Sequence, residues 1–180
     1  TSLEDPQDID FIQYGNYLVT VHNNVGSTTS EMRIAKLKNL YQYPTESKEI
    51  ITRTNSELRG ISSSDNSGHV FVLNKNILEK WTFNGSSLTG PVQTATLQNS
   101  LGQSVRVIKR RIIYIAYNNY IDMYFMKTSD NDLSDIEYTH QTNLNDVIPS
   151  TARSLNLSIT ALNIDPTTSH ISVYCLENKQ

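Results

Sequence analysis

The sequence predicts an all-β fold made of repeated units of four short strands, and three observations lead to this prediction. The first is the stretch Ile112–Tyr117, six uncharged residues rich in β-branched and aromatic side chains. A run this short and apolar is typical of a strand that is covered on both faces. The second is Asn118-Asn119, which predicts a two-residue turn because Asn tolerates the positive φ that such turns need. The third is that a strand, a tight turn and a returning strand such as Tyr120–Lys127 recur along the chain.

The composition bounds the class of protein. The chain has 180 residues, of which 37% are hydrophobic and 18% charged, and this length is enough for one domain with a real core. Fifteen basic and eighteen acidic residues give a net charge of −3, which offers no electrostatic case for nucleic acid or an anionic membrane surface. No apolar run approaches the roughly 20 residues of a membrane span. The single cysteine, Cys175, excludes an internal disulfide framework and slightly favours an intracellular, reducing compartment over secretion.

The turn signals divide the chain into four units, over residues 7–54, 55–100, 101–150 and 151–180. We regard them as one all-β domain, or as a piece of a larger one. One stretch of the first unit, Glu31–Leu40, also fits a helical face, but it occupies the place that plain strands take in the later units. The expected strands are Ile9–Tyr14, Asn16–His22, Glu31–Leu40 and Ser47–Thr52 in the first unit; Glu57–Ser62, His69–Asn74, Ile77–Phe83 and Pro91–Gln98 in the second; Ser104–Lys109, Arg111–Tyr117, Tyr120–Lys127 and Asp135–His140 in the third; and Leu155–Ile164 and His170–Leu176 in the fourth. Asn23–Ser30 and Thr142–Arg153 are expected to be loops, with turns at Gly15 and at Asp65–Gly68.

The spacing of the units points to a known repeat. Their second strands begin at Asn16, His69, Arg111 and His170, which lie 53, 42 and 59 residues apart. Four-stranded propeller blades repeat at roughly 40–50 residues, and loops lengthen single blades. Leu58–Leu88 resembles a β-propeller blade of the NHL or WD-repeat-like kind, through Gly60-Ile61, Asp65, Gly68, Val70-Phe71-Val72, Ile77, Trp81-Thr82-Phe83 and Gly85. The other units match this pattern loosely, and the Trp-Asp ending of the WD signature is absent.

The resemblance implies β-propeller-like repeats: three four-stranded blades and a partial fourth, as part of a larger propeller. An open arc of blades leaves strand edges and apolar faces uncovered, so we expect a protein partner, or further sequence of the same protein, to complete it. A β-sandwich is the alternative architecture. Seven residues of the second strands are expected to be buried: Leu18, Val70, Val72, Ile112, Tyr114, Ile115 and Val173.

The sequence offers no catalytic, cofactor-binding or metal-binding residue. It has no phosphate-binding glycine loop, nucleophile elbow or zinc-binding Cys/His spacing. His69 and His170 share a position at the start of a second strand, but a metal site needs three or four converging ligands, so we interpret both as solvent-exposed polar residues. No two carboxylates or histidines are expected to converge at the axis of the repeat.

Two charged stretches also favour a structural interpretation. In Ser129–Asp135, Asp130 and Asp132 are spaced as in a calcium-binding EF-hand, but Asp135 stands where Gly is required and Gln141 where the closing Glu is required. A solvated hairpin loop is therefore expected. Lys109-Arg110-Arg111 is expected to be a charged turn that protects the neighbouring apolar strands from aggregation, since a nucleic-acid surface usually carries a broader basic footprint.

The aromatic residues form the last candidate group. Tyr114, Tyr117, Tyr120, Tyr124 and Phe125 are dense enough for a stacking surface, but in adjacent strands they are more often packed between sheets, and Trp81 is interpreted in the same way. The triplets Asn84-Gly85-Ser86 and Asn156-Leu157-Ser158 match the glycosylation acceptor pattern and leave secretion open.

Together these features predict a non-catalytic protein-binding scaffold within a larger assembly, with recognition by its faces and loops. Two alternatives stay open: a secreted carbohydrate-binding or adhesion β domain, and part of a propeller enzyme whose catalytic residues lie outside this chain.

Overall fold

The fold is almost entirely β. The computed structural model describes residues 4–12, 16–37, 49–64, 67–165 and 167–178. The strands are β1 (Glu4–Ile12), β2 (Tyr17–Asn24), β3 (Thr29–Lys36), β4 (Glu49–Thr54), β5 (Leu58–Ser64), β6 (His69–Asn74), β7 (Ile77–Phe83), β8 (Leu88–Thr96), β9 (Ser104–Ile108), β10 (Ile112–Ala116), β11 (Tyr120–Met126), β12 (Ile136–Asn143), β13 (Leu157–Ile164) and β14 (Ile171–Glu177). The helical segments are α1 (Leu144–Val147) and a 3₁₀ turn at Ser150–Ala152.

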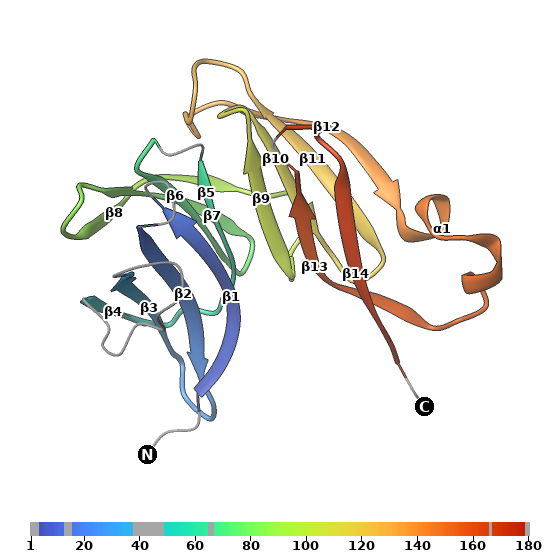
Figure 1. The fold of residues 1–180 in the computed structure, drawn as a ribbon, viewed down its shortest axis with the longest axis horizontal. Coiled ribbons are helices and arrows are strands. Elements are labelled where there is room, and N and C mark those ends of the chain that lie inside the picture. Colours follow the sequence, from blue (N-terminus) through green and yellow to red (C-terminus); the bar gives the residue numbers. More distant parts are fainter. Residues whose placement is uncertain (1–3, 13–15, 38–48, 65–66, 166, 179–180) are drawn as a thin grey trace.

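These strands form four antiparallel sheets, each made of strands that are consecutive in the sequence (Figure 1). The first sheet has the order β1-β2-β3-β4, the second β5-β6-β7-β8 and the third β9-β10-β11-β12, while the fourth is the pair β13-β14. The prediction of an all-β chain of repeated antiparallel units is therefore confirmed.

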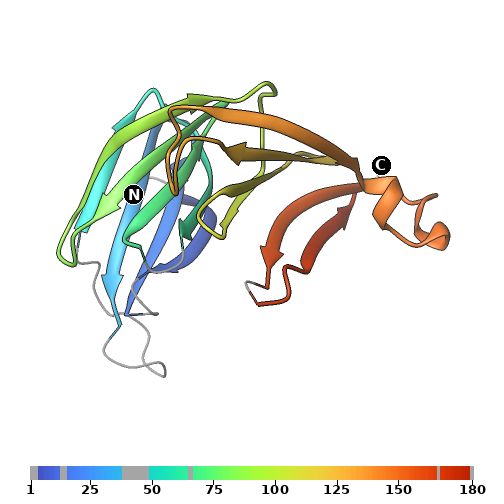
Figure 2. The ribbon, with the colours of Figure 1, turned by 90° about the horizontal axis from the view of Figure 1, so that it is seen from above.

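The four sheets follow one another in sequence order, each facing the next, from the blue first sheet to the red fourth sheet (Figure 2). Contacts run between the first strands of neighbouring sheets: β1 with β5, β5 with β9, and β9 with β13. We call these four the inner strands. The other strands of each sheet lie progressively farther from this line.

The core consists of three layers, one between each pair of neighbouring sheets. A strand of a middle sheet has to bury both of its faces, which explains the uninterrupted apolar run Val70–Leu73 of β6. Val70 and Val72 belong to the layer shared with the first sheet, whereas Phe71 and Leu73 belong to the layer shared with the third.

Burial follows the predicted core in part. Val70, Val72 and Ile115 are fully buried. Leu18, Ile112, Tyr114 and Val173 are only half-buried, contrary to the prediction. Leu18 lies on the outer face of the first sheet, away from the second. Ile112 and Tyr114 lie on the face of the third sheet that the two-stranded fourth sheet covers incompletely, and Val173 belongs to that fourth sheet.

Several predicted boundaries need correction. β1 begins at Glu4, and β12 runs to Asn143 and leads directly into α1, so the predicted loop Thr142–Arg153 is largely structured. The predicted loop Asn23–Ser30 shrinks because β2 and β3 extend into it. The ambiguous stretch Glu31–Leu40 is a strand as far as Lys36.

Other predicted features lie outside the described residues: the turn at Gly15, the first half of the Asp65–Gly68 turn, the end of Glu31–Leu40 and the start of Ser47–Thr52.

The tight turns differ from the prediction in their backbone angles. The Asn118-Asn119 turn forms, and Tyr117 N donates to Tyr120 O over 2.8 Å. Positive φ angles occur instead in other tight turns, at Lys75 (57°) between β6 and β7 and at Lys109 (48°) and Arg110 (57°) between β9 and β10. The basic cluster is thus a charged turn, as predicted.

Among the described residues, no helix is long and apolar enough to cross a membrane.

Candidate functional site

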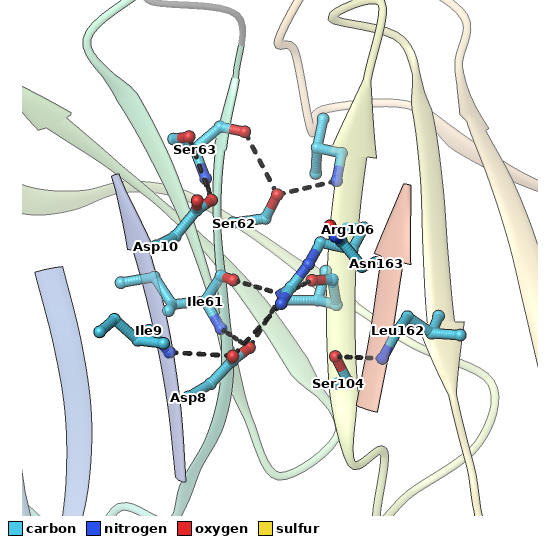
Figure 3. A network of polar contacts seen from close by, with 12 residues as sticks. Asp8, Ile9, Asp10, Ile61, Ser62, Ser63, Ser104, Arg106, Leu162 and Asn163 are labelled. Carbon is cyan, nitrogen blue, oxygen red and sulfur yellow. Dashed lines mark hydrogen bonds and ion pairs between the residues drawn. The ribbon is translucent and has the colours of Figure 1, made fainter. Parts of the chain in front are cut away.

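Charged side chains converge where the inner strands meet, which the sequence interpretation did not anticipate. Asp8 and Asp10 project from β1 toward β5, because they alternate with outward-pointing neighbours and share a face with the buried Ile12. Arg106 reaches the same place from β9 (Figure 3). We call Asp8, Asp10, Ser62, Ser63, Ser104 and Arg106 the inner polar cluster.

The centre of the inner polar cluster is an ion pair that joins three sheets. Arg106 Nη1 lies 2.9 Å from Asp8 Oδ2, and Nη2 lies 3.3 Å from Oδ1. Asp8 also accepts hydrogen bonds from the backbone N–H of Ile61 (3.0 Å) and of Ile9 (2.9 Å). The same guanidinium donates to the carbonyl of Ile61 over 2.8 Å. With the two side chains only 11% and 16% exposed, the pair is largely removed from water, so each partner depends on the other.

Asp10, two residues after Asp8 in β1, also accepts hydrogen bonds from β5 and from its own strand. Its Oδ2 accepts from Ser63 N (2.6 Å) and Ser63 Oγ (3.1 Å), and its Oδ1 accepts from Phe11 N (2.8 Å). Burial raises the pKa of this carboxyl, and the hydrogen bonds from Ser63 and Phe11 and the charge of Arg106 oppose the rise only in part.

Serines continue this pattern toward the fourth sheet. Ser62 Oγ accepts from Val107 N over 2.9 Å, and Ser104 Oγ accepts from Leu162 N over 3.3 Å (Figure 3). The inner strands of different sheets do not pair in a ladder, so their inward N–H groups need other acceptors. At each junction, as we call the contact between two neighbouring sheets, a short side chain from the preceding sheet supplies such an acceptor.

Close approach of the inner strands also depends on a glycine. A Cβ atom at Gly60 would lie 2.8 Å from the backbone nitrogen of Val105, so β5 and β9 could not come as close with any larger residue at that position.

The inner polar cluster therefore holds sheets together and keeps little capacity for chemistry. A carboxylate has about four acceptor positions, and Asp8 accepts four contacts from within the chain. Across the part of the chain that the structure describes, no group of three or more His, Cys, Asp and Glu residues is arranged to hold a metal ion.

A second buried charge lies farther out, between the first and second sheets. Glu79 of β7 is buried, and its carboxylate binds Arg53 of β4 at 2.7 Å. The same carboxylate accepts from Trp81 Nε1 (3.0 Å) and Asn74 Nδ2 (2.9 Å), and the Arg53 guanidinium lies 5.3 Å from the centre of the Trp81 ring. This ion pair closes the outer part of the first junction.

His170 is exposed as interpreted, whereas His69 is half-buried, contrary to the interpretation of both histidines as solvent-exposed. His69 belongs to the second sheet and His170 precedes β14 in the fourth, so the two are not brought together. In the loop between β11 and β12, Asp130 pairs with Arg111 at 2.8 Å and Asp132 accepts from Ser134 N at 2.9 Å. Asp132 also accepts from Gln93 Nε2 of β8 over 2.9 Å, so these carboxylates hold the loop in place against neighbouring segments.

The tyrosines are packing residues. Tyr117 and Tyr124 are buried, and the rings of Tyr117 and Tyr120 stack with their centres 4.6 Å apart. The rings of Tyr124 and Tyr138 meet edge to face at 5.6 Å. These contacts join strands of the third sheet, so the aromatic group does not form an exposed stacking surface.

A sequence signal for the inner polar cluster existed. Asp8 and Asp10 alternate within the first strand, and Arg106 interrupts an otherwise apolar inner strand. A charge at a position whose neighbours predict burial indicates a partner. Asp8 was missed because the first strand was predicted to begin one residue later, at Ile9.

Comparisons with known proteins inform only on the fold of this chain. No protein-family model and no curated protein matches the sequence. Among solved structures, a chain of hydrazine synthase from Kuenenia stuttgartiensis is similar with a TM-score of 0.56 and 11% identity, over 92% of this chain and 57% of that one. KlHsv2 with loop 6CD replaced by a Gly-Ser linker aligns with a TM-score of 0.45 and 9% identity, over 96% of this chain and 60% of that one. The present chain thus spans little more than half the length of the hydrazine synthase chain, and the likeness extends to the arrangement of antiparallel sheets.

Proposed function

We propose that the four sheets are blades of a β-propeller and that the protein is a non-catalytic scaffold that binds other proteins. One observation carries this proposal: the converging charged groups are bound to partners within the chain, whereas large apolar side chains are exposed on the first and last sheets. Monomeric proteins rarely leave such groups of apolar side chains uncovered, so they favour contact with another protein.

The outer face of the first sheet illustrates the pattern. The register aligns Ile9, Thr20, Arg33 and Ile50 in one row across its four strands. Ile9 is 50% exposed and Ile50 54%. Phe11, also half-exposed, lies on the same face two residues from Ile9. Apolar side chains beside a charged group such as Arg33 are typical of a protein interface with a polar rim.

Mutation of this face tests the proposal. The tagged chain is isolated from its natural source, and the mass of the assembly is measured by native mass spectrometry. We expect a stoichiometric complex with another protein, and we expect Phe11→Asp combined with Ile50→Asp to reduce its yield at least tenfold. Leu101→Asp is the matched control, because Leu101 is an exposed apolar residue in a loop outside the first sheet.

Two results would contradict the proposal. A chain that stays free at physiological concentration, or whose assembly survives the double substitution unchanged, would contradict a scaffold that binds through this face.

A further inference from the structure

A polar cavity of about 370 Å³ lies at the junction of the first and second sheets. The β2–β3 loop, the β4–β5 connection and the β6–β7 turn line it, together with residues of β1, β2, β3 and β5. Every residue of its lining has a charged, hydroxyl or amide side chain, so the cavity suits a polar ligand rather than an apolar one. Both of the sheets around it are four-stranded, so the cavity does not depend on the two-stranded fourth sheet.

Backbone hydrogen bonds fix the walls of this cavity. Ser56 N donates to Thr28 O over 3.2 Å and joins the β4–β5 connection to the β2–β3 loop. Lys75 N donates to Glu57 O over 3.1 Å and joins the same connection to the β6–β7 turn. The walls are therefore formed in the free chain, and a ligand does not have to order them when it binds.

Charges of both signs line the cavity and only one pair of them is joined. Arg59 of β5 binds Glu57 in an ion pair. Asp5 of β1 and Lys75 of the β6–β7 turn pair neither with each other nor with another charged side chain among the described residues. The Lys75 ammonium group donates only to the carbonyl of Asn55, over 3.3 Å. A molecule that carries two opposite charges can satisfy both of these groups at once.

Arg59 offers a further donor to such a molecule. Its Nε is buried and has no hydrogen-bond acceptor in the structure. Almost all buried donors have a partner, and a donor without one costs free energy. A ligand oxygen that draws the guanidinium toward the cavity would remove this cost.

We propose that this cavity binds a small zwitterionic molecule of the amino-acid or short-peptide class. The carboxylate of the ligand lies between Lys75 and Arg59, and its ammonium group pairs with Asp5. The Thr28 hydroxyl and the Asn55 amide, both in the lining, bond to the polar remainder of the ligand. This small-molecule site is independent of the proposed binding of other proteins.

Ligands of other classes match the lining less well. A simple anion would meet the carboxylates of Asp5 and Glu57, and a simple cation would meet Arg59 and Lys75. A neutral sugar would use the hydroxyl and amide groups but would leave Asp5 and Lys75 without partners.

The test is an NMR titration of the ¹⁵N-labelled chain with glycine, Gly-Gly and Gly-Gly-Gly, in which the two charges lie progressively farther apart. At least one of them should shift the backbone amide signals of Thr28, Glu57 and Lys75 in a saturable way. Its N-acetylated form lacks the ammonium group and its C-terminal amide lacks the carboxylate. Each blocked form should bind at least tenfold more weakly, because each leaves one charge of the cavity without a partner. These probes leave the protein unaltered, so a folding defect cannot produce the result.

Protein variants locate the site. Asp5→Asn and Lys75→Asn should each weaken binding at least tenfold. Both residues are exposed, and Asn tolerates the positive φ of 57° at Lys75, so the fold should be retained. Arg153→Gln is the matched control, because Arg153 is an exposed cation that lines a different cavity, and it should leave binding within twofold.

Four results would overturn the proposal. The first is that none of the three probes produces saturable shifts at the cavity. The second is that both blocked forms bind as well as the parent molecule. The third is that only one of the two blocked forms is weakened, which would show a site for a simple anion or cation. The fourth is that binding survives both Asp5→Asn and Lys75→Asn, which would place it elsewhere on the chain.

Discussion

The junction between the first and second sheets differs from that between the third and fourth along its whole width. At the first junction, Asp8 and Asp10 join the inner strands and the Arg53–Glu79 pair closes the outer part around Trp81. At the last junction, Ser104 Oγ accepts a single hydrogen bond from Leu162 N, and a cavity lies between the outer parts of the two sheets. The same repeating unit thus closes the first junction by packing its outer strands, whereas the last junction contains a cavity.

Two buried carboxylates at equivalent positions of their strands show a similar contrast. Glu79 and Asp122 occupy the third position of β7 and β11, and both are buried. Glu79 binds the cation Arg53, whereas Asp122 accepts from the amides of Asn99 (2.9 Å) and Gln141 (3.4 Å). Burial accordingly raises the pKa of Asp122.

The largest effect is expected where a buried charge loses its partner. Arg53→Met leaves the Glu79 carboxylate without a cation and should lower the free energy of unfolding by about 2–3 kcal/mol, less than for a fully buried pair because Arg53 is partly exposed. Urea unfolding measures the change. Adding Glu79→Gln should recover more than half of the loss, since a neutral side chain needs no cation. A double variant that is as unstable as Arg53→Met would contradict this role for the pair.

Substitutions at the two ends of the inner polar cluster should lower the free energy of unfolding by different amounts. Asp8→Ala leaves Arg106 unpaired and Ile61 N without an acceptor, which should cost about 2 kcal/mol. Ser104→Ala, the matched change at the last junction, should cost about 1 kcal/mol because it removes a single neutral acceptor. Equal losses in urea unfolding would show that the two junctions do not differ as described.

The pH dependence of stability should report the buried Asp122. Its folded-state pKa is raised, so the stability that its neutral form provides is present in full below the ordinary Asp pKa of about 3.9 and is lost as the pH rises through the raised pKa. Asp122→Asn cannot ionise, so it should gain stability relative to the wild type between pH 4 and pH 7. The free energy of unfolding is measured for both proteins at each pH. Asp10 contributes to its pH dependence in both, so the difference between the two proteins reports Asp122. A difference that stays constant with pH would contradict the assignment.

The smallest effect is expected for the histidines. Replacing His69 and His170 together by Ala should change the free energy of unfolding by less than about 0.5 kcal/mol, since His170 is exposed and His69 lies outside the core. Added Zn²⁺ should not shift the melting temperature of either protein. A zinc-dependent shift that the double variant abolishes would show a metal site that the structural interpretation excludes.

Strand positions followed from local signals, whereas the contacts that distinguish the junctions did not. The apolar run around Ile115 and the turn at Asn118-Asn119 identified β10 and β11, because period and turn chemistry are properties of neighbouring residues. Asp8 meets Ile61, 53 residues away, and Arg106, 98 residues away. Nothing in the spacing of one sequence fixes such a pairing until the inner strands have been placed side by side. Leu18 and Ile112 show the same limit, since their burial depends on whether another sheet covers the face on which they lie.

Residue-resolved hydrogen exchange of the free chain tests the central contrast between closed and open edges most directly. The backbone amides of Ile113 and Ile115 bond within a four-stranded sheet, while those of Ile171, Val173 and Cys175 face the open side of β14. The β14 amides should therefore exchange at least ~100-fold faster than the β10 amides. Equal protection of the two sets would contradict an open edge on the fourth sheet.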